Sequence, residues 1–235
     1  EAHYKYALTH PMEETPAMAF GSLFHCQVLE TAEVEDRYAV APICDKRTKA
    51  GKAIMAEWLP SAEGKIVVSE SDMVQVREMH QSLILHPVAR DLIERSGENE
   101  QAIFSEDRDT GILKKGKLDR ICKNTNILVD LKSSGDASPQ GFQKSVFSYG
   151  YHCQSAYYTD LATEQGLDIE KMLFVVVEKT APYNVAVYEL CPHSLEIGRR
   201  TYKENLYKLA NCEMSDTWQG YSSEIETIET HAYIK

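Results

Sequence analysis

A chain of 235 residues is long enough to bury a sizeable core, as one large domain or two small ones. Its 43% apolar and 26% charged residues are typical of a globular protein, and no apolar run approaches the roughly 18 residues of a membrane span. The net charge of −11 argues against a general nucleic-acid coat protein. A DNA enzyme is not excluded, because it needs only a local basic channel and bound divalent metals.

Six cysteines are scattered along the chain without a CxxC pair, so neither metal-ligand spacing nor a disulfide framework is indicated. We therefore expect reduced thiols and a cytoplasmic location. No signal peptide is visible. Because the first residue is Glu1 and not Met, we expect the chain to be a fragment of a longer protein.

Helical patterns fill most of the first part of the chain. Thr15 is a good N-cap for a helix whose first residue is Pro16. A short strand is predicted at 36–42, and the polar, basic loop "CDKRTKAGKA" then leads into a helix at about 53–59.

Two further helices are predicted before the first long strand. Ser69 and Asp72 resemble a capping box in front of apolar residues at helical spacing. Pro87 starts a second, shorter helix that ends near Gly97.

The rest of the chain mixes strands with helices. Strands are predicted at 100–105, 112–122, 126–132, 172–179 and 184–190, and helices at 140–149, 154–165 and 192–209. The turns "DRDTG" and "KNTN" connect the first three strands as hairpins. This order predicts one mixed α/β domain over residues 1–235, with a helical N-terminal portion of about 1–97 packed on a core of about 98–212.

The segment "NILVDLKSS" reads as a buried strand that carries an anion and a cation. Asp130 and Lys132 are two residues apart, so both side chains project from the same face. An ion pair alone would explain them, because buried charges need a partner or a metal. The preceding strand, "KKGKLDRI", carries Asp119, and a short turn could bring this carboxylate close to Asp130.

Two carboxylates beside a lysine make a site suited to Mg²⁺, which prefers carboxylates and substrate phosphate. Asp130 would then hold metal, and Lys132 would orient the attacking water or help to deprotonate it. In this context "GKLDRI" and "NILVDLKSS" resemble the PD-(D/E)XK nuclease core, with Asp119 as the first acid. Leu118 replaces the proline of the motif's name, which does not touch metal.

Two further motifs resemble the RecB-like branch of these nucleases. "YHCQSAYYTD" is similar to its Q-x-x-x-Y element through Gln154 and Tyr158, and "AFGSLFHCQVLE" is similar to its histidine motif through His25. Within the branch, the chain resembles the exonuclease VIII (RecE-type) nuclease domain of phages and prophages. "AHYKYAL", "GSLFHCQVLE", "RTKAGKA", "GKLDRI", "VDLKSS", "YHCQSAYYTD" and "SDTWQGY" occur in that family's order and span nearly the whole chain.

The resemblance implies a restriction-endonuclease-like mixed sheet flanked by helices. It implies a Mg²⁺-dependent exonuclease, with Mn²⁺ as a substitute, that degrades linear double-stranded DNA from 5′ to 3′. The 3′ single-stranded tails would pass to a single-strand annealing protein for homologous recombination. We expect a ring-shaped homotetramer, as in that family, and no membrane partner. Some RecB-like relatives hold an iron–sulfur cluster through one early and three late cysteines, and because only Cys191 and Cys212 lie late, we expect none.

The resemblance also implies roles for individual residues. Metal ligation would fall to His25, Glu100, Asp119, Asp130 and Leu131, and catalysis to Asp119, Asp130, Lys132, Gln154 and Tyr158. Glu100 could equally be a solvated residue at a strand start, and a lone helical histidine such as His25 is usually structural. Gln154 and Tyr158 lie one helical turn apart, which suits gripping a phosphate or the end nucleotide.

The basic loop supplies candidate DNA contacts at Lys46, Arg47, Lys49 and Lys52, although charge runs are usually only solvated. Two alternatives to the exonuclease stay open. One is a single-strand or structure-specific RecB-like nuclease. The other is a non-catalytic DNA-binding scaffold, which the presence of Asp119, Asp130 and Lys132 disfavours.

Overall fold

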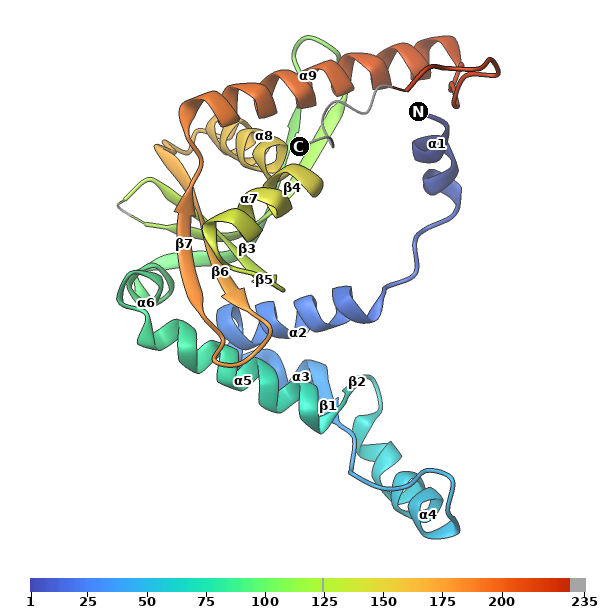
Figure 1. Cartoon of the computed structure of the whole chain (residues 1–235), viewed down its shortest axis with the longest axis vertical. Helices are drawn as coiled ribbons and strands as arrows, with labels where there is room; N and C mark the ends of the chain where they lie inside the picture. Colours follow the sequence, from blue (N-terminus) through green and yellow to red (C-terminus); the bar gives the residue numbers. More distant parts are fainter. Residues whose placement is uncertain (124, 229–235) are drawn as a thin grey trace.

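A five-stranded mixed sheet forms the centre of the molecule (Figure 1). The computed structural model describes residues 1–123 and 125–228. In their order across the sheet, the strands are β3 (Gly97–Glu106), β4 (Leu113–Cys122), β5 (Ile127–Ser134), β6 (Lys171–Glu178) and β7 (Val185–Glu189). β5 and β6 run parallel and the other neighbours run antiparallel. The predicted mixed α/β fold is confirmed.

Helices cover both faces of this sheet (Figure 1). One face packs against α2 (Pro16–Leu29), α5 (Glu70–Leu85) and α6 (Pro87–Glu94), which belong to the helical N-terminal portion. The other face packs against α7 (Pro139–Ser148) and α8 (Tyr151–Glu164). The long helix α9 (Pro192–Ser215) lies along α8 and ends later than the sequence predicts.

Strand β5 contributes to both cores through alternate residues. Val129 and Leu131 belong to the core on the α2 side, whereas Leu128 belongs to the core on the α7 side. Because side chains alternate along a strand, Asp130 and Lys132 share the face of Leu128 and project toward α7 and α8. The charged pair therefore lies beneath these two helices.

Shorter elements connect the N-terminal helices. They are α1 (Ala2–Thr9), η1 (Thr31–Glu33), α3 (Val34–Arg37), β1 (Tyr38–Val40), α4 (Lys49–Trp58), η2 (Leu59–Ala62) and β2 (Ile66–Val68). β1 and β2 form a parallel pair, from which residues 41–65 project as an arm that carries α4 (Figure 1). β1 falls within the strand predicted at 36–42, whereas the sequence pattern predicts neither α1 nor β2.

The predicted helix starts at Thr15 and Ser69 are confirmed. The Thr15 hydroxyl accepts the N–H of Met18 at 3.3 Å, and the Ser69 hydroxyl accepts the N–H of Asp72 at 3.0 Å. Each side chain thereby satisfies one of the amide groups that the first helical turn leaves unpaired.

The start of α4 corrects the prediction for the basic loop. Thr48 caps this helix by accepting the N–H of Gly51 at 3.0 Å, so α4 begins at Lys49 and not near residue 53. Lys49 and Lys52 therefore lie in the first helical turns, and only Lys46 and Arg47 remain in the loop.

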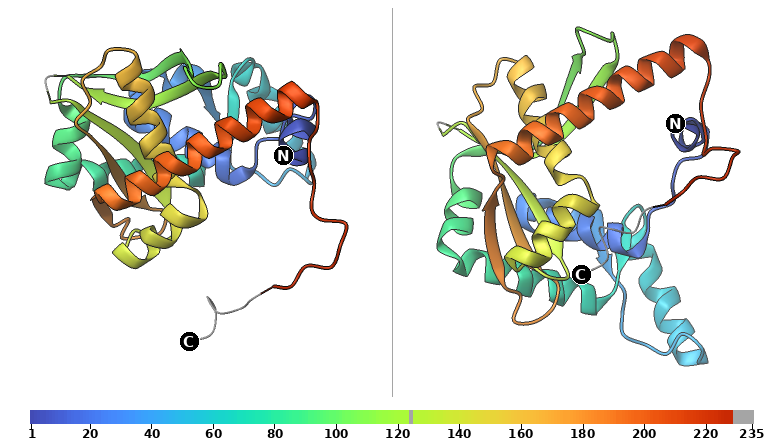
Figure 2. Two further views of the ribbon diagram at one scale, coloured as in Figure 1. Left: turned by 90° about the horizontal axis from the view of Figure 1, so that it is seen from above. Right: turned by 45° about the horizontal axis from the view of Figure 1, so that its top comes forward.

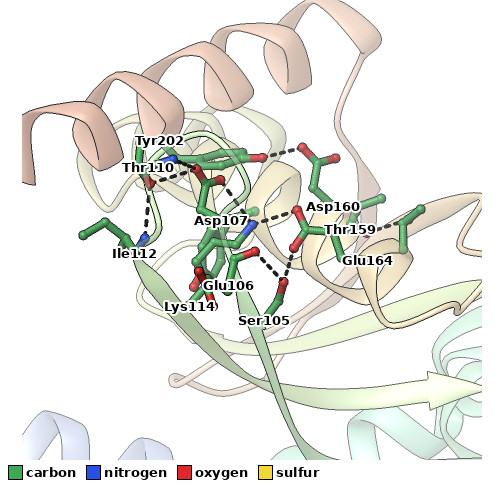
Figure 3. A network of polar contacts seen from close by, with 12 residues as sticks. Ser105, Glu106, Asp107, Thr110, Ile112, Lys114, Thr159, Asp160, Glu164 and Tyr202 are labelled. Carbon is green, nitrogen blue, oxygen red and sulfur yellow. Dashed lines mark hydrogen bonds and ion pairs between the residues drawn. The ribbon is translucent and has the colours of Figure 1, made fainter. Parts of the chain in front are cut away.

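A buried lysine fastens the β3–β4 hairpin to α8 (Figure 3). Lys114 Nζ lies 2.7 Å from Glu164 Oε1 and 3.5 Å from Asp107 Oδ2, and only 2% of its side chain is exposed. Ser105 donates a second hydrogen bond to Glu164 at 2.6 Å. These partners offset the cost of burying the ammonium group, so the position of β4 relative to α8 is fixed by charge as well as by packing.

The N-terminal helix α1 packs against the segment that follows α9 (Figure 2). The amide of Ala2 donates to the carbonyl of Gln219 at 3.0 Å. Lys5 Nζ lies 3.4 Å from Asp216 Oδ1, and the ring of Tyr4 stacks on Trp218 with centroids 6.0 Å apart. We call this contact between residues 1–5 and 216–219 the terminal clasp.

Two expectations fall partly outside the described residues. The turn predicted at 123–126 includes residue 124, and the domain predicted to end at 235 includes residues 229–235. Within the described ranges, none of the helices combines the length and the hydropathy that crossing a bilayer would require.

Candidate active site

The candidate site begins where β4 and β5 separate. Their backbones pair from Cys122 opposite Ile127 to Arg120 opposite Val129. One step farther, the carboxylate of Asp119 accepts the N–H of Leu131 at 2.9 Å. The Asp119 carboxylate here takes the place of a main-chain carbonyl as the acceptor. This hydrogen bond holds the Asp119 side chain between β4 and β5.

The neighbouring strand β3 is also irregular at this level. Glu100 has a φ of 55°, a left-handed conformation that costs a residue with a side chain roughly 1–3 kcal/mol. The β3–β4 ladder continues on both sides, from Asn99 opposite Arg120 to Gln101 opposite Leu118, but omits Glu100 and Asp119 between them.

The irregularity changes which way β4 faces. Leu118 belongs to the core on the α7 side, whereas Arg120 donates to the carbonyl of Leu92 at 2.8 Å, on the α6 side. In a regular strand, residues two apart share one face. The alternation of β4 is therefore interrupted between Leu118 and Arg120, and Asp119 can meet groups from both sides of the sheet.

From the α2 side, His25 reaches this position. Its Nδ1 lies 3.6 Å from Asp119 Oδ2 and 3.9 Å from Glu100 Oε1. One ligand atom from each of the three residues lies within 4.8 Å of the others. Glu100 Oε1 is buried, and within the described part of the chain it has no hydrogen-bond partner.

This donor set fits a divalent cation. Two carboxylates are the hard oxygen ligands that Mg²⁺ prefers, and an imidazole suits Mn²⁺ better than Mg²⁺. A cation at this position would also satisfy the unpaired oxygen of Glu100. We conclude that the residues present are compatible with a metal centre of the type the resemblance implies.

From the α8 side, Asp130 and Lys132 complete the site. Asp130 is 1% exposed, and its Oδ2 lies 2.5 Å from Lys132 Nζ. Gln154 donates to Asp130 Oδ1 at 2.6 Å. Asp130 is thus held between a cation and an amide, beside the group formed by His25, Glu100 and Asp119.

The charges in the site perturb one another strongly. Burial and the negative charge of Asp130 raise the pKa of Asp119 to about 6. Burial lowers the pKa of His25, but the nearby carboxylates of Glu100, Asp119 and Asp130 outweigh burial, so the pKa is raised. Without a cation, the negative charge of Asp130 therefore favours protonation of Asp119, and a divalent ion would relieve this repulsion.

The pKa of Lys132 is raised, although burial alone would lower it. Burial lowers the pKa of its ammonium group, but the charges of Asp130 and Asp119 outweigh this effect and raise the pKa. The side chain also lies over the ring of Tyr151, with Nζ 4.8 Å from the ring centroid. Lys132 is therefore held as a cation facing Asp130.

Of the two residues of the Q-x-x-x-Y element, Gln154 contacts Asp130 directly and Tyr158 lies one helical turn later. Burial and then the negative charges of Asp130 and Asp119 raise the pKa of Tyr158. The ring of Tyr158 packs on β4 at Gly116, where an added Cβ would come within 3.1 Å of it. Gln154 is thus placed to orient Asp130, and Tyr158 packs α8 against β4 beside it.

Leu131 differs from the other predicted metal ligands. Its side chain is fully buried in the core on the α2 side, and its N–H is the donor to Asp119. Only its main-chain carbonyl could ligate a metal, because the side chain offers no donor atom.

A cavity of about 380 Å³ opens in front of His25 and Glu100. Gly21, Ser22 and Lys117 are among the residues that line it. A Cβ built on Gly21 meets no heavy atom within 4 Å, so this side of α2 leaves the approach open. Two of the predicted metal ligands, His25 and Glu100, therefore line an open cavity.

The four basic residues predicted to contact DNA lie apart from this site. Lys46 and Arg47 precede α4, and Lys49 and Lys52 lie in its first turns, on the projecting arm (Figure 1). Arg47 bonds to Asp45 through its side chain at 3.0 Å. Any contact of these residues with DNA would therefore be remote from Asp119 and Asp130.

Two residues that the sequence motifs do not single out also belong to the site. Lys117 pairs with Glu100, and together with His25 it lowers the pKa of this acid, although burial alone would raise it. Its position two residues before Asp119 in a strand is the signal that could have found it. Tyr151 lies three residues before Gln154 in α8, on the same helix face, which is the corresponding signal for this ring.

Comparisons with known proteins agree with this geometry. No curated protein matches the sequence. The crystal structure of a "putative exonuclease" from Eubacterium rectale superposes with a TM-score of 0.61 at 13% identity, covering 95% of this chain and 82% of that one. This likeness shows a shared fold. The structure of SSO0001 gives a TM-score of only 0.36 at 18% identity, over 80% of this chain and 86% of that one, and carries no argument.

The family comparison covers nearly all of the sequence. Residues 1–231 match the family described as "PDDEXK-like domain of unknown function (DUF3799)". The mixed sheet flanked by helices, with the acids at its centre, agrees with this match. The chain therefore belongs to the family of PDDEXK-like domains.

Proposed function

We propose that the protein is a metal-dependent deoxyribonuclease that acts as a 5′-to-3′ exonuclease on linear double-stranded DNA. The observation that carries this proposal is the convergence of His25, Glu100 and Asp119 within 4.8 Å, beside the Asp130–Lys132 pair. Membership of the PDDEXK-like family and the fold shared with the "putative exonuclease" support the nuclease class. The 5′-to-3′ direction and the role in recombination rest on the resemblance to exonuclease VIII domains.

The residues divide into two functional groups. His25, Glu100 and Asp119 would hold Mg²⁺ or Mn²⁺, which supplies the charge that activates water and neutralises the leaving oxygen. Asp130 completes the acidic centre and fixes the ammonium of Lys132. Because the pKa of Lys132 is raised, this side chain stays protonated at neutral pH. It would therefore orient water and stabilise phosphate charge rather than remove a proton.

Gln154 contributes by positioning. Its amide holds one oxygen of Asp130 while Lys132 holds the other. With both oxygens fixed, the carboxylate keeps one orientation relative to Asp119. This arrangement would reduce the reorganisation needed when a phosphate enters the site.

The test uses purified protein on linear duplex DNA that carries a label on either the 5′ or the 3′ end. We expect loss of the 5′ label as mononucleotides in Mg²⁺ or Mn²⁺ and no digestion in EDTA. Asp119→Ala, Asp130→Ala and Lys132→Ala should each abolish digestion, while Asp109→Ala, an exposed acid in the β3–β4 turn, should not. Unimpaired digestion by the Asp130→Ala protein would remove the active-site assignment.

His25→Ala separates metal binding from DNA binding. We expect a severe loss of cleavage in both metals with little change in DNA affinity, because His25 faces Asp119 and Glu100. Wild-type cleavage by this variant would return His25 to a structural role.

The same substrates distinguish the alternative nuclease. A single-strand or structure-specific enzyme would leave blunt duplex intact and cut single strands or junctions. A non-catalytic scaffold would bind DNA and cut none of them in either metal.

We further propose that the enzyme works as a ring-shaped homotetramer and passes 3′ tails to a single-strand annealing protein. Enclosure would retain DNA although the net charge of −11 repels phosphate over most of the surface. A monomeric mass by light scattering, together with processive digestion, would contradict the ring.

A further inference from the structure

A series of aromatic rings leads from the catalytic lysine to the surface. Lys132 Nζ lies 4.8 Å from the centroid of the Tyr151 ring, and this ring lies 5.6 Å from that of Tyr149, at an interplanar angle of 33°. Tyr149 is 72% exposed, and Phe147, two residues earlier, is 83% exposed. We call Phe147 and Tyr149 the aromatic step.

The aromatic step stands on an ordered turn between two helices. α7 ends at Ser148, where the amide of Tyr149 donates to the carbonyl of Ser145 at 2.9 Å. Gly150 then adopts a left-handed conformation, with a φ of 68°, and leads directly into α8. Glycine takes this conformation without a steric penalty, so the chain turns sharply and leaves the preceding rings outside the core.

The inner end of the ring series is anchored in the core. Tyr151 packs against Phe142 and Phe174, with centroids 5.9 Å away in each case. Phe174 is fully buried on β6, next to the central strand of the sheet. The ring next to Lys132 is therefore fixed, and Tyr149, which leans on it, has a fixed neighbour on one side and solvent on the other.

We infer that the aromatic step is a stacking platform for an unpaired nucleobase of the DNA strand that enters the site. This inference rests on the proposed function, because it takes Asp130 and Lys132 as the groups that meet the phosphate. Only one ring, that of Tyr151, separates Tyr149 from the Lys132 ammonium. A nucleotide next to the cleaved phosphate would therefore have its base beside Tyr149.

The chemistry of the platform selects its ligand. Every nucleobase presents a flat π-face, so stacking on tyrosine or phenylalanine tolerates all four bases. Inside a duplex both faces of a base are covered by neighbouring pairs, so an internal base reaches the platform only after it has left the stack. The enzyme would thereby hold the end of one strand after it has separated from its complement.

The test measures equilibrium binding in EDTA, so that it does not depend on cleavage. The probe is a fluorescent 12-nucleotide single strand, followed by anisotropy, together with a set of the same strands that each lack one base. We expect Tyr149→Ala to weaken binding of the intact strand by about 5- to 150-fold, the fold-change that corresponds to about 1–3 kcal/mol of stacking. Tyr149→Phe keeps the ring and should bind as the wild type does.

The decisive readout is the coupling between Tyr149 and one base. For the wild type, we expect one abasic position to weaken binding far more than the others. For Tyr149→Ala, removal of that base should cost little more, because the stacking partner is already gone. Phe104→Ala on β3, which removes another exposed ring, serves as the matched control and should leave affinity unchanged.

Several outcomes would overturn the platform. They are unchanged affinity of Tyr149→Ala, additive losses for Tyr149→Ala and every abasic strand, or an equal loss on blunt duplex. Thermal denaturation of each variant checks the fold, and the exposure of Tyr149 predicts little change. Failure of the proposed function has a different signature, namely wild-type digestion by Asp130→Ala, which leaves the binding result standing.

Discussion

At the scale of single residues, Glu100 determines how the site is assembled. Its left-handed backbone conformation coincides with the gap in the β3–β4 ladder, opposite Asp119. The side chains of both residues then converge on His25 from α2. Unfavourable backbone conformations persist where the surrounding structure fixes them, and they are common at functional sites. We interpret the distortion as the feature that frees Asp119 from strand alternation.

Gly21 provides a test of access to the site. A Cβ at this position would meet no heavy atom within 4 Å, so Gly21→Ala should fold normally and gain about 0.5–1 kcal/mol from its helix propensity. Gly21→Leu should fold too, but its side chain would fill the cavity in front of His25 and Glu100. We expect digestion of linear duplex to fall at least about tenfold for the Leu variant alone, a loss of about 1.4 kcal/mol in transition-state binding. Equal rates for the two variants would show that substrate does not pass this side of α2.

The sequence predicts part of this site and omits another part for a physical reason. Period-two spacing places Asp130 and Lys132 on one face, and in the structure Lys132 Nζ lies 2.5 Å from Asp130 Oδ2. The conformation of Glu100 follows from no local preference, because glutamate disfavours positive φ and only the tertiary structure imposes it. The change of face between Leu118 and Arg120 could therefore not be read from the alternation of β4.

At the scale of elements, local signals predict where helices begin when a capping side chain is present. Thr15 and Ser69 fix the starts of α2 and α5. The start of α4 is missed because Thr48, its cap, lies within a run of basic residues that reads as a loop. The consequence is functional, since Lys49 and Lys52 now stand at a helix N-terminus, where amide groups and the helix dipole favour anions.

The arm is expected to contact DNA through these lysines. If Lys49 and Lys52 each neutralise a phosphate, replacing both by Gln should reduce the slope of log affinity against log salt by about two units on duplex DNA. Lys123→Gln with Lys171→Gln removes the same charge from residues that pair with Glu98 and Glu189, and should leave the slope unchanged. Equal slopes for the arm variant and the wild type would mean that Lys49 and Lys52 face solvent and do not contact DNA.

The packing of α9 on α8 provides a test of pH dependence. Burial raises the pKa of Asp160, but hydrogen bonds from Arg199 and Tyr202 outweigh it, so the pKa is lowered from its usual value. A lowered folded-state pKa means stability that is fully present above about pH 4, the unfolded pKa of aspartate, and is lost as the pH falls below it. Asp160→Asn should therefore be less stable than the wild type at pH 7, by about 1–3 kcal/mol.

The measurement is urea denaturation of both proteins from pH 7 down to pH 3. The difference between them should narrow below about pH 4, because protonation removes the same charge from the wild type. A constant difference across this range would mean that Asp160 contributes through packing and neutral hydrogen bonds alone.

At the scale of the whole molecule, segments far apart in the sequence meet on both sides of the sheet. α2 and α8 are separated by the sheet, yet His25 from one and Gln154 from the other reach the acids of β4 and β5. Side chains from helices on opposite faces of the sheet therefore meet at the gap in the strand pairing beside Asp119. Distant segments also meet at the termini, where the terminal clasp joins α1 to the segment that follows α9 (Figure 2).

The terminal clasp is expected to hold α1 in its helical form. An isolated helix of eight residues is unstable in water, and none of the side chains of α1 is buried. Trp218 stacks on Tyr4 and lies beneath the ammonium of Lys5, 4.9 Å from the ring centroid. Trp218→Ala should therefore raise hydrogen exchange at the amides of residues 5–9 to nearly the rate of an unfolded peptide, while exchange in β5 and β6 stays slow.

Trp58→Ala on the arm removes the other tryptophan of the chain and should leave α1 protected. Tyr4→Ala should expose the same amides as Trp218→Ala, and the double variant should add little, because both changes remove one contact. Retained protection of α1 in Trp218→Ala would show that the main-chain bond of Ala2 to Gln219 and the ion pair of Lys5 are sufficient to hold the helix.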